Sequence, residues 1–130
     1  MDEELYKENI LDHYKNPRNY GEIENPDISY FDTNPLCGDE LQMQIKIKDG
    51  KAEDVKFKGK GCSISQASAS MLTEMIKGQD MEEIKKIGKK DILDAVGLQL
   101  GPSRIKCALL SLKVLKAGAY GLKTEDEEEE

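Results

Sequence analysis

The sequence has no tryptophan, a single histidine and few aromatic residues, which make up 5% of its 130 positions. It also lacks any apolar run near the roughly 20 residues that a membrane-spanning helix needs. The first ten residues are acidic with a helical pattern, whereas a secretory signal peptide begins with basic residues followed by an apolar stretch. We therefore expect a cytoplasmic protein that does not interact with membranes.

Basic residues are not gathered into a stripe with aromatic residues between them, so we expect no nucleic-acid binding. The net charge of −7 is concentrated at one end of the chain. Six of the 26 acidic residues lie in the terminal EDEEEE, which leaves 20 acidic against 19 basic residues elsewhere. Because a block of like charge usually stays solvated, we expect one domain over residues 1–123 and an acidic, disordered tail over 124–130.

Cysteine is also scarce, and three cysteines are too few for a small secreted domain held together by disulfides. In a cytoplasmic chain the remaining roles are an inert core thiol, a reactive thiol or a metal ligand. A cysteine hydrolase needs a base, normally histidine, to activate its thiol. His13, the only histidine, is far from every cysteine in the sequence. We expect it to make a structural hydrogen bond from a helix.

The first half of the chain predicts a helix followed by a small antiparallel sheet. Residues 3–14 have the apolar spacing of an amphipathic helix. A short strand is expected over residues 27–32, and two longer strands over 41–48 and 52–59. Asp49–Gly50 between the longer strands is a strong hairpin signal. Lysines alternate with apolar residues in both strands, so one face of the sheet should face solvent.

The second half of the chain predicts only helices. They are expected over residues 63–77, ended by Gly78, over 81–87, over 89–96 and over 101–118. Pro102 or Ser103 should open the last helix, and Gly118 should end it. Strands followed by helices, with one helix in front, indicate an α+β domain. We expect a three-stranded antiparallel sheet with several helices packed on one face.

The three cysteines are all expected in turns or near helix starts. Cys37 precedes Gly38 in a turn, Cys62 lies between a glycine loop and a helix, and Cys107 lies in the first turns of the last helix. The positive end of a helix dipole favours a thiolate. A single cysteine of this kind is more often a small buried residue. The three placements together favour a metal or sulfur site.

Asp39 adds a carboxylate to this set. It stands two residues after Cys37, so in an extended segment both side chains project to the same side. Three thiolates and a carboxylate suit tetrahedral zinc, and thiolates also hold iron in a sulfide cluster. A carboxylate is a harder and weaker ligand than a thiolate, so one coordination position of the metal can exchange its ligand. Gly59 and Gly61 before Cys62, and Gly38 next to Cys37, allow the backbone to open. This ligand set suits a metal centre that is assembled and then given away.

Four motifs resemble the iron–sulfur cluster assembly scaffolds of the IscU type, which include the N-terminal domain of NifU and the SufU proteins. They occur in the family's order as DHYKNPRN, NPLCGDEL, FKGKGCSISQASASML and RIKCALLSLKVL, and they span nearly the whole chain before the acidic tail. The resemblance implies a non-enzymatic scaffold. On it, sulfur from a cysteine desulfurase and iron form a [2Fe–2S] cluster that passes to apo iron–sulfur proteins. It also implies that Cys37, Cys62 and Cys107 bind the cluster, and that Asp39 tunes cluster lability or binds zinc.

The chain mixes two branches of this family. Lys106 precedes the third cysteine, as in the SufU branch, whereas the IscU branch has histidine there. Lys106 is therefore a candidate modulator of the site, although an ordinary solvated lysine is an equal alternative. Residues 78–103 leave no room for the insertion that SufU proteins usually carry. The stretch LGPSR also differs from the Leu-Pro-Pro-Val-Lys peptide that IscU proteins present to an Hsp70, which argues against Hsp70-assisted transfer.

The SufU-like features leave a second function open, that of a zinc-dependent sulfur acceptor for a cysteine desulfurase. Zn²⁺ would then bind the same cysteines and Asp39. Docking on the desulfurase would free one thiolate, that of Cys107, to receive sulfur. This alternative would make the protein a sulfurtransferase.

Overall fold

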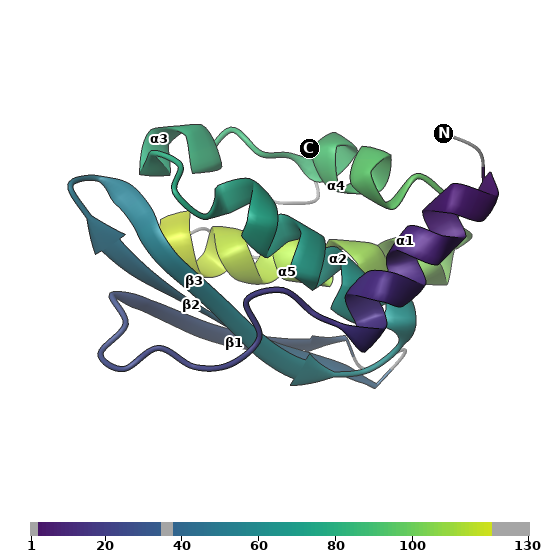
Figure 1. Cartoon of the computed structure of the whole chain (residues 1–130), viewed down its shortest axis with the longest axis horizontal. Helices are drawn as coiled ribbons and strands as arrows, with labels where there is room; N and C mark the ends of the chain where they lie inside the picture. The colour runs from purple at the N-terminus through teal and green to yellow at the C-terminus, as the bar shows by residue number, and fades with distance from the viewer. Residues whose placement is uncertain (1–2, 35–37, 121–130) are drawn as a thin grey trace.

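The computed structural model describes residues 3–34 and 38–120, with the backbone alone at Ala119 and Tyr120. These residues form the predicted α+β domain, with a three-stranded antiparallel sheet and helices packed on it (Figure 1). The elements are α1 (Glu3–Lys15), β1 (Ile28–Asn34), β2 (Asp39–Lys48), β3 (Lys51–Lys60), α2 (Ser63–Ile76), α3 (Met81–Ile84), α4 (Lys89–Val96) and α5 (Pro102–Tyr120).

The sheet has the strand order β1-β2-β3. Asn34 of β1 pairs with Asp39 of β2 as the last pair of their ladder. Asp49 and Gly50, at the opposite end of β2, have φ values of 54° and 76°. Positive φ at both central residues is the requirement of a type I′ turn, which an Asp-Gly sequence favours. The hairpin predicted from the sequence is thus confirmed.

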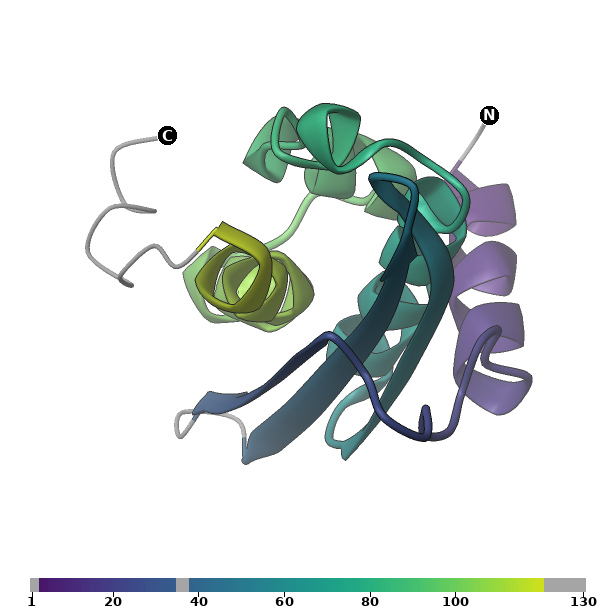
Figure 2. The ribbon, with the colours of Figure 1, turned by 90° about the vertical axis from the view of Figure 1, so that its left-hand side faces the viewer.

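Helices α2 and α5 pack on the apolar face of the sheet. Leu41, Met43 and Ile45 alternate along β2 and are at most 2% exposed, so they form the centre of the core. Figure 2 shows α5 end-on beside the inner face of the curved sheet. Lysines of β2 and β3, such as Lys48 and Lys58, are exposed, as expected for a sheet with one wet face.

Helix α2 is buried on all sides, although its sequence predicts one apolar face. It packs against α1, α5, β3 and α4, so even Ser65, Ser68 and Ser70 are at most 1% exposed. Small side chains let neighbouring elements approach closely. The hydroxyl groups of Ser65 and Ser68 donate to carbonyl groups at the start of α2 itself. Ser70 instead contacts α1, because its Oγ lies 2.7 Å from His13 Nδ1. This contact agrees with the structural role expected for His13.

The end of α5 differs from the sequence-based prediction. Gly118 was expected to stop this helix, but the helix continues to Tyr120. A Cβ atom at position 118 would lie 3.0 Å from side-chain atoms of both Ile28 and Tyr30 on β1. The glycine therefore allows close helix–sheet packing and does not act as a helix stop.

Two sequence-based expectations concern the chain ends and membranes. The acidic tail expected over residues 124–130 lies outside the described residues and stays a prediction. Across residues 3–34 and 38–120, none of the helices combines the length and apolar character that a membrane crossing requires.

Candidate metal centre

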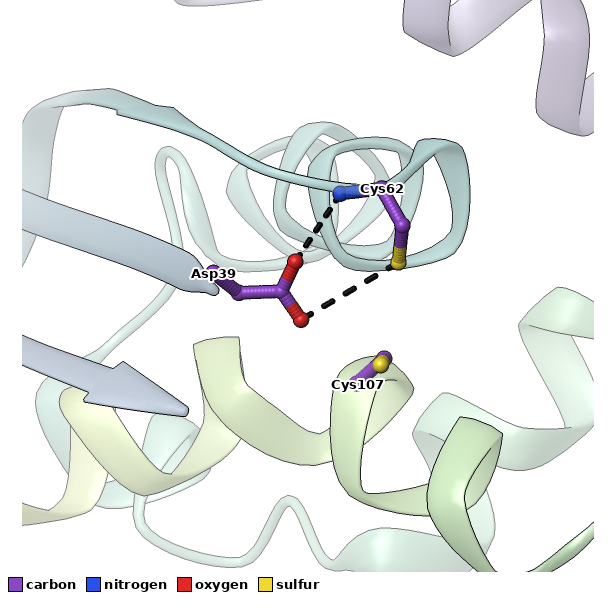
Figure 3. Close-up of side chains that lie close together, drawn as sticks. All are labelled: Asp39, Cys62 and Cys107. Atoms are coloured by element: carbon purple, nitrogen blue, oxygen red, sulfur yellow. Dashed lines mark hydrogen bonds between the residues drawn. The ribbon is translucent and has the colours of Figure 1, made fainter. Parts of the chain in front are cut away.

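Three elements bring a carboxylate and two thiols together at one end of the sheet. Asp39 begins β2, Cys62 precedes the first residue of α2, and Cys107 lies in the second turn of α5. One oxygen of Asp39 and the two sulfur atoms all lie within 4.8 Å of one another (Figure 3). The structure therefore assembles three of the four residues that the sequence singled out.

The two oxygens of Asp39 have different partners. Oδ1 accepts a hydrogen bond from the backbone N–H of Cys62 at 2.9 Å, and Oδ2 lies 4.0 Å from Cys62 Sγ (Figure 3). The side chain is fully buried. The first oxygen thus fixes the orientation of the carboxylate, and the second faces the sulfur atoms.

Cys62 is the N-cap residue of α2, as its position in the sequence predicts. Its backbone is extended, with φ −72° and ψ 163°, and its sulfur accepts the N–H of Ser65 at 3.5 Å. An N-cap side chain normally contributes an oxygen that accepts this hydrogen bond. Here a sulfur takes that place, next to the positive end of the helix dipole.

Gly61 has a specific steric function beside the site. Its φ is +149°, and a Cβ atom there would lie 2.2 Å from Asp39 Oδ1 and 2.9 Å from Asp39 Cα. No side chain fits at that distance. The sequence suggested glycines that let the backbone open, whereas the structure shows that this glycine makes room for the Asp39 carboxylate.

Cys107 is fully buried and contacts a residue that the sequence-based reasoning missed. The side-chain amide of Asn34, itself 8% exposed, donates a hydrogen bond to Cys107 Sγ at 3.7 Å. Asn34 stands only three residues before Cys37, but its proximity to Cys107 depends on how β1 packs against α5. A position in the NPLCGDEL motif was the one available signal.

Two predicted site residues are not placed at the centre. Cys37 lies outside the described residues, although Asn34 and Asp39 on either side of it both belong to the site. Lys106 is exposed on the surface of α5. Its role as a modulator stays a prediction.

The donor set fits a metal that prefers sulfur. Zinc binds sulfur at about 2.3 Å and carboxylate oxygen at about 2.0–2.2 Å, which places tetrahedral sulfur and oxygen ligands about 3.6 Å apart. The 4.0 Å between Asp39 Oδ2 and Cys62 Sγ is close to this value. Thiolates are also the ligands of iron–sulfur clusters. Small inward movements would bring these three side chains to the ligand spacing of a zinc or iron site.

Comparisons with known proteins agree with this geometry. The model of the NifU-like N terminal domain matches residues 5–128. The chain is 43% identical over 131 residues to the zinc-dependent sulfurtransferase SufU of Bacillus subtilis strain 168, covering 88% of each chain. It is 39% identical over 126 residues to the iron–sulfur cluster assembly scaffold protein IscU of Escherichia coli K12, covering 94% of this chain and 97% of that one.

A solved structure from thermophilic Fervidobacterium islandicum AW-1, described as an iron–sulfur cluster assembly scaffold protein for the SUF system, has the same fold. Its TM-score is 0.77 at 30% identity, over 92% of this chain and 99% of that chain. The family match covers more than half of the chain, and the sequence relatives exceed 30% identity over most of its length. The chain therefore belongs to the family of NifU-like N-terminal domains.

Proposed function

We propose that this protein is a scaffold on which a [2Fe–2S] cluster is assembled and then transferred to apo iron–sulfur proteins. The observation that carries the proposal is the convergence of the buried Asp39 carboxylate with the sulfurs of Cys62 and Cys107. Sulfur would come from a cysteine desulfurase. The IscU relatives, which are named as scaffolds, support this function.

The ligands in this proposal are Cys37, Asp39, Cys62 and Cys107. Asp39 would bind through Oδ2, because Oδ1 is already engaged with the backbone of Cys62. A single carboxylate oxygen binds the iron of a sulfide cluster less firmly than a thiolate does. The bond between Asp39 and the cluster is therefore the one that we expect to break first when the cluster is transferred. The chain acts as a carrier and performs no catalytic turnover of its own.

A zinc-dependent sulfur acceptor is the second candidate, favoured by the SufU relative that is named a zinc-dependent sulfurtransferase. The same four residues would bind Zn²⁺. The thiolate of Cys107 would attack the outer sulfur of a persulfide on the desulfurase. The persulfide S–S bond breaks, Cys107 becomes a persulfide and the desulfurase cysteine leaves as a thiolate. Because Cys107 is fully buried, this reaction also requires α5 or its neighbours to open.

The deciding experiment measures iron, zinc and acid-labile sulfide per chain. The protein is incubated anaerobically with ferrous iron, cysteine, a thiol reductant and a cysteine desulfurase. Iron and sulfide that appear together, and leave together when apo-ferredoxin is added, would support the scaffold. Bound zinc without labile sulfide on the chain, together with a cysteine persulfide in a parallel sample that contains no thiol reductant, would favour the sulfur acceptor and reject the scaffold. The cytoplasmic location and the absence of an Hsp70 partner stay predictions.

A further inference from the structure

The two thiols that the structure describes accept N–H groups from different sources. The donor to Cys62 is the backbone of Ser65, within the same helix. The donor to Cys107 is the side chain of Asn34, which belongs to β1. The backbone N–H at a helix start is present whatever the side chain of that residue is. The side-chain amide, in contrast, depends on asparagine at position 34.

The position of Asn34 links two parts of the site. It is the last residue of β1 and pairs with Asp39 across the β1–β2 ladder. Its side chain reaches α5 and is 8% exposed, so the hydrogen bond to Cys107 is shielded from water. A buried amide has to be hydrogen-bonded to offset its loss of hydration. The amide nitrogen of Asn34 meets this need through the sulfur of Cys107.

We propose that Asn34 is a positioning residue that holds Cys107 Sγ toward Asp39 and Cys62 and keeps its hydrogen bond when metal is bound. This inference rests on the proposed metal site. Groups that hydrogen-bond to metal ligands fix the orientation of those ligands, and their loss typically lowers metal affinity about 10- to 100-fold. Hydrogen bonds to sulfur also tune the reduction potentials of iron–sulfur clusters.

The first test compares zinc affinities, measured on the full chain by competition with a chelator. Asn34→Leu keeps a side chain of similar size but removes the donor, and Asn34→Ala removes both. We expect both variants to bind zinc about 10- to 100-fold more weakly than the unmodified chain. Ser111→Ala is the matched control. Ser111 is also fully buried, one helical turn beyond Cys107, and its hydroxyl has no hydrogen-bond partner among the described residues.

The second test uses the unmodified chain loaded with ¹¹³Cd, a spin-active substitute for zinc. A hydrogen bond from Asn34 to a metal-bound sulfur should give a scalar coupling between ¹¹³Cd and the side-chain amide proton. The amide signal is assigned by its absence in Asn34→Leu. A merely structural contact would not produce this coupling, and the coupling itself is measured on the unmodified chain.

The outcomes separate this inference from the function on which it rests. Weaker zinc binding by both Asn34 variants, unchanged binding by Ser111→Ala and a coupling at the Asn34 amide would support the inference. Unchanged affinity in Asn34→Leu, or weaker affinity without any coupling, would overturn the role of Asn34 and leave the metal site intact. Failure of the unmodified chain to bind zinc or cadmium would overturn the role of Asn34 together with the zinc site, whereas the cluster scaffold is tested separately by the iron and sulfide measurement.

Discussion

At the scale of single residues, Asp39 is the fully buried carboxylate of the site. A fully buried carboxylate is costly unless its charge is hydrogen-bonded or paired with a cation. Oδ1 has the backbone N–H of Cys62, whereas Oδ2 faces Cys62 Sγ at 4.0 Å, and a thiol is only a weak donor. A metal ion at Oδ2 would supply the missing positive charge, so this residue favours an occupied site.

Two substitutions of Asp39 separate its hydrogen bond from its charge. Asp39→Ala leaves the partly buried N–H of Cys62 without its acceptor, so the metal-free protein should lose about 1 kcal/mol of stability. Asp39→Asn keeps an oxygen for that N–H and should lose less. Both variants should release zinc faster than the unmodified chain, because both lack the anionic ligand. Urea unfolding without metal measures the loss of stability. Transfer of zinc to a chelator measures the rate of zinc release. Unchanged zinc release in both would remove Asp39 from the ligand set.

Gly61 is the second residue that the site requires. Gly61→Ala places a methyl group against the Asp39 carboxylate and also imposes an unfavourable φ. We expect a loss of about 1–3 kcal/mol or more in urea unfolding of the metal-free protein. Gly101→Ala is a suitable control, since a Cβ atom there meets nothing within 4 Å. Equal stability of the two variants would show that the Asp39 carboxylate moves freely.

At the scale of elements, α1 packs against α2 through polar contacts around His13. Ser70 Oγ lies 2.7 Å from His13 Nδ1 and also accepts the backbone N–H of Arg18 at 2.9 Å. Burial lowers the pKa of His13, and the positive charge of Arg18 lowers it further, against the opposing effects of Glu74 and Asp12. The packing of α1 thus depends on an uncharged imidazole.

This arrangement predicts a stability that depends on pH. A lowered pKa in the folded state means that the unfolded chain binds the proton more readily. The stabilising contribution of neutral His13 is therefore complete above about pH 6.5 and is lost as the pH falls from there toward the lower pKa of the folded state. Urea unfolding of metal-free protein at pH 7.5 and 5.5 should show this loss, and His13→Gln should reduce it. An equal loss in His13→Gln would assign it to other groups.

The same elements show what the sequence could predict. The alternation along β2 and the Asp49–Gly50 turn fixed the hairpin because both signals are local. The N-cap position of Cys62 was predictable for the same reason. The contact of Asn34 with Cys107 and the packing of Gly118 on β1 were not, because each depends on how α5 lies on the sheet. The order of neighbouring residues does not predict long-range packing of this kind.

At the scale of the whole molecule, the site lies where the sheet meets two of the helices that pack on it. Cys107 belongs to an apolar cluster formed by α1, α2, α4 and α5, whereas Asp39 begins a strand of the sheet. A metal bound to Asp39, Cys62 and Cys107 would join the sheet to two helices. These ligands come together only in the folded chain, so metal binding should stabilise the fold as a whole.

This coupling predicts a melting temperature that rises with free zinc. At a zinc concentration about 100 times the Kd, the folded state should gain about 2.7 kcal/mol. Cys62→Ala removes a partly buried ligand and should abolish most of the rise. Lys48→Ala should keep it, because Lys48 is exposed at the end of β2 opposite Asp39. Thermal unfolding of the three proteins across a zinc titration, with a chelator as the zero point, measures the effect. A flat profile in the unmodified chain, or an equal rise in Cys62→Ala, would mean that zinc does not bind at this centre in the folded state.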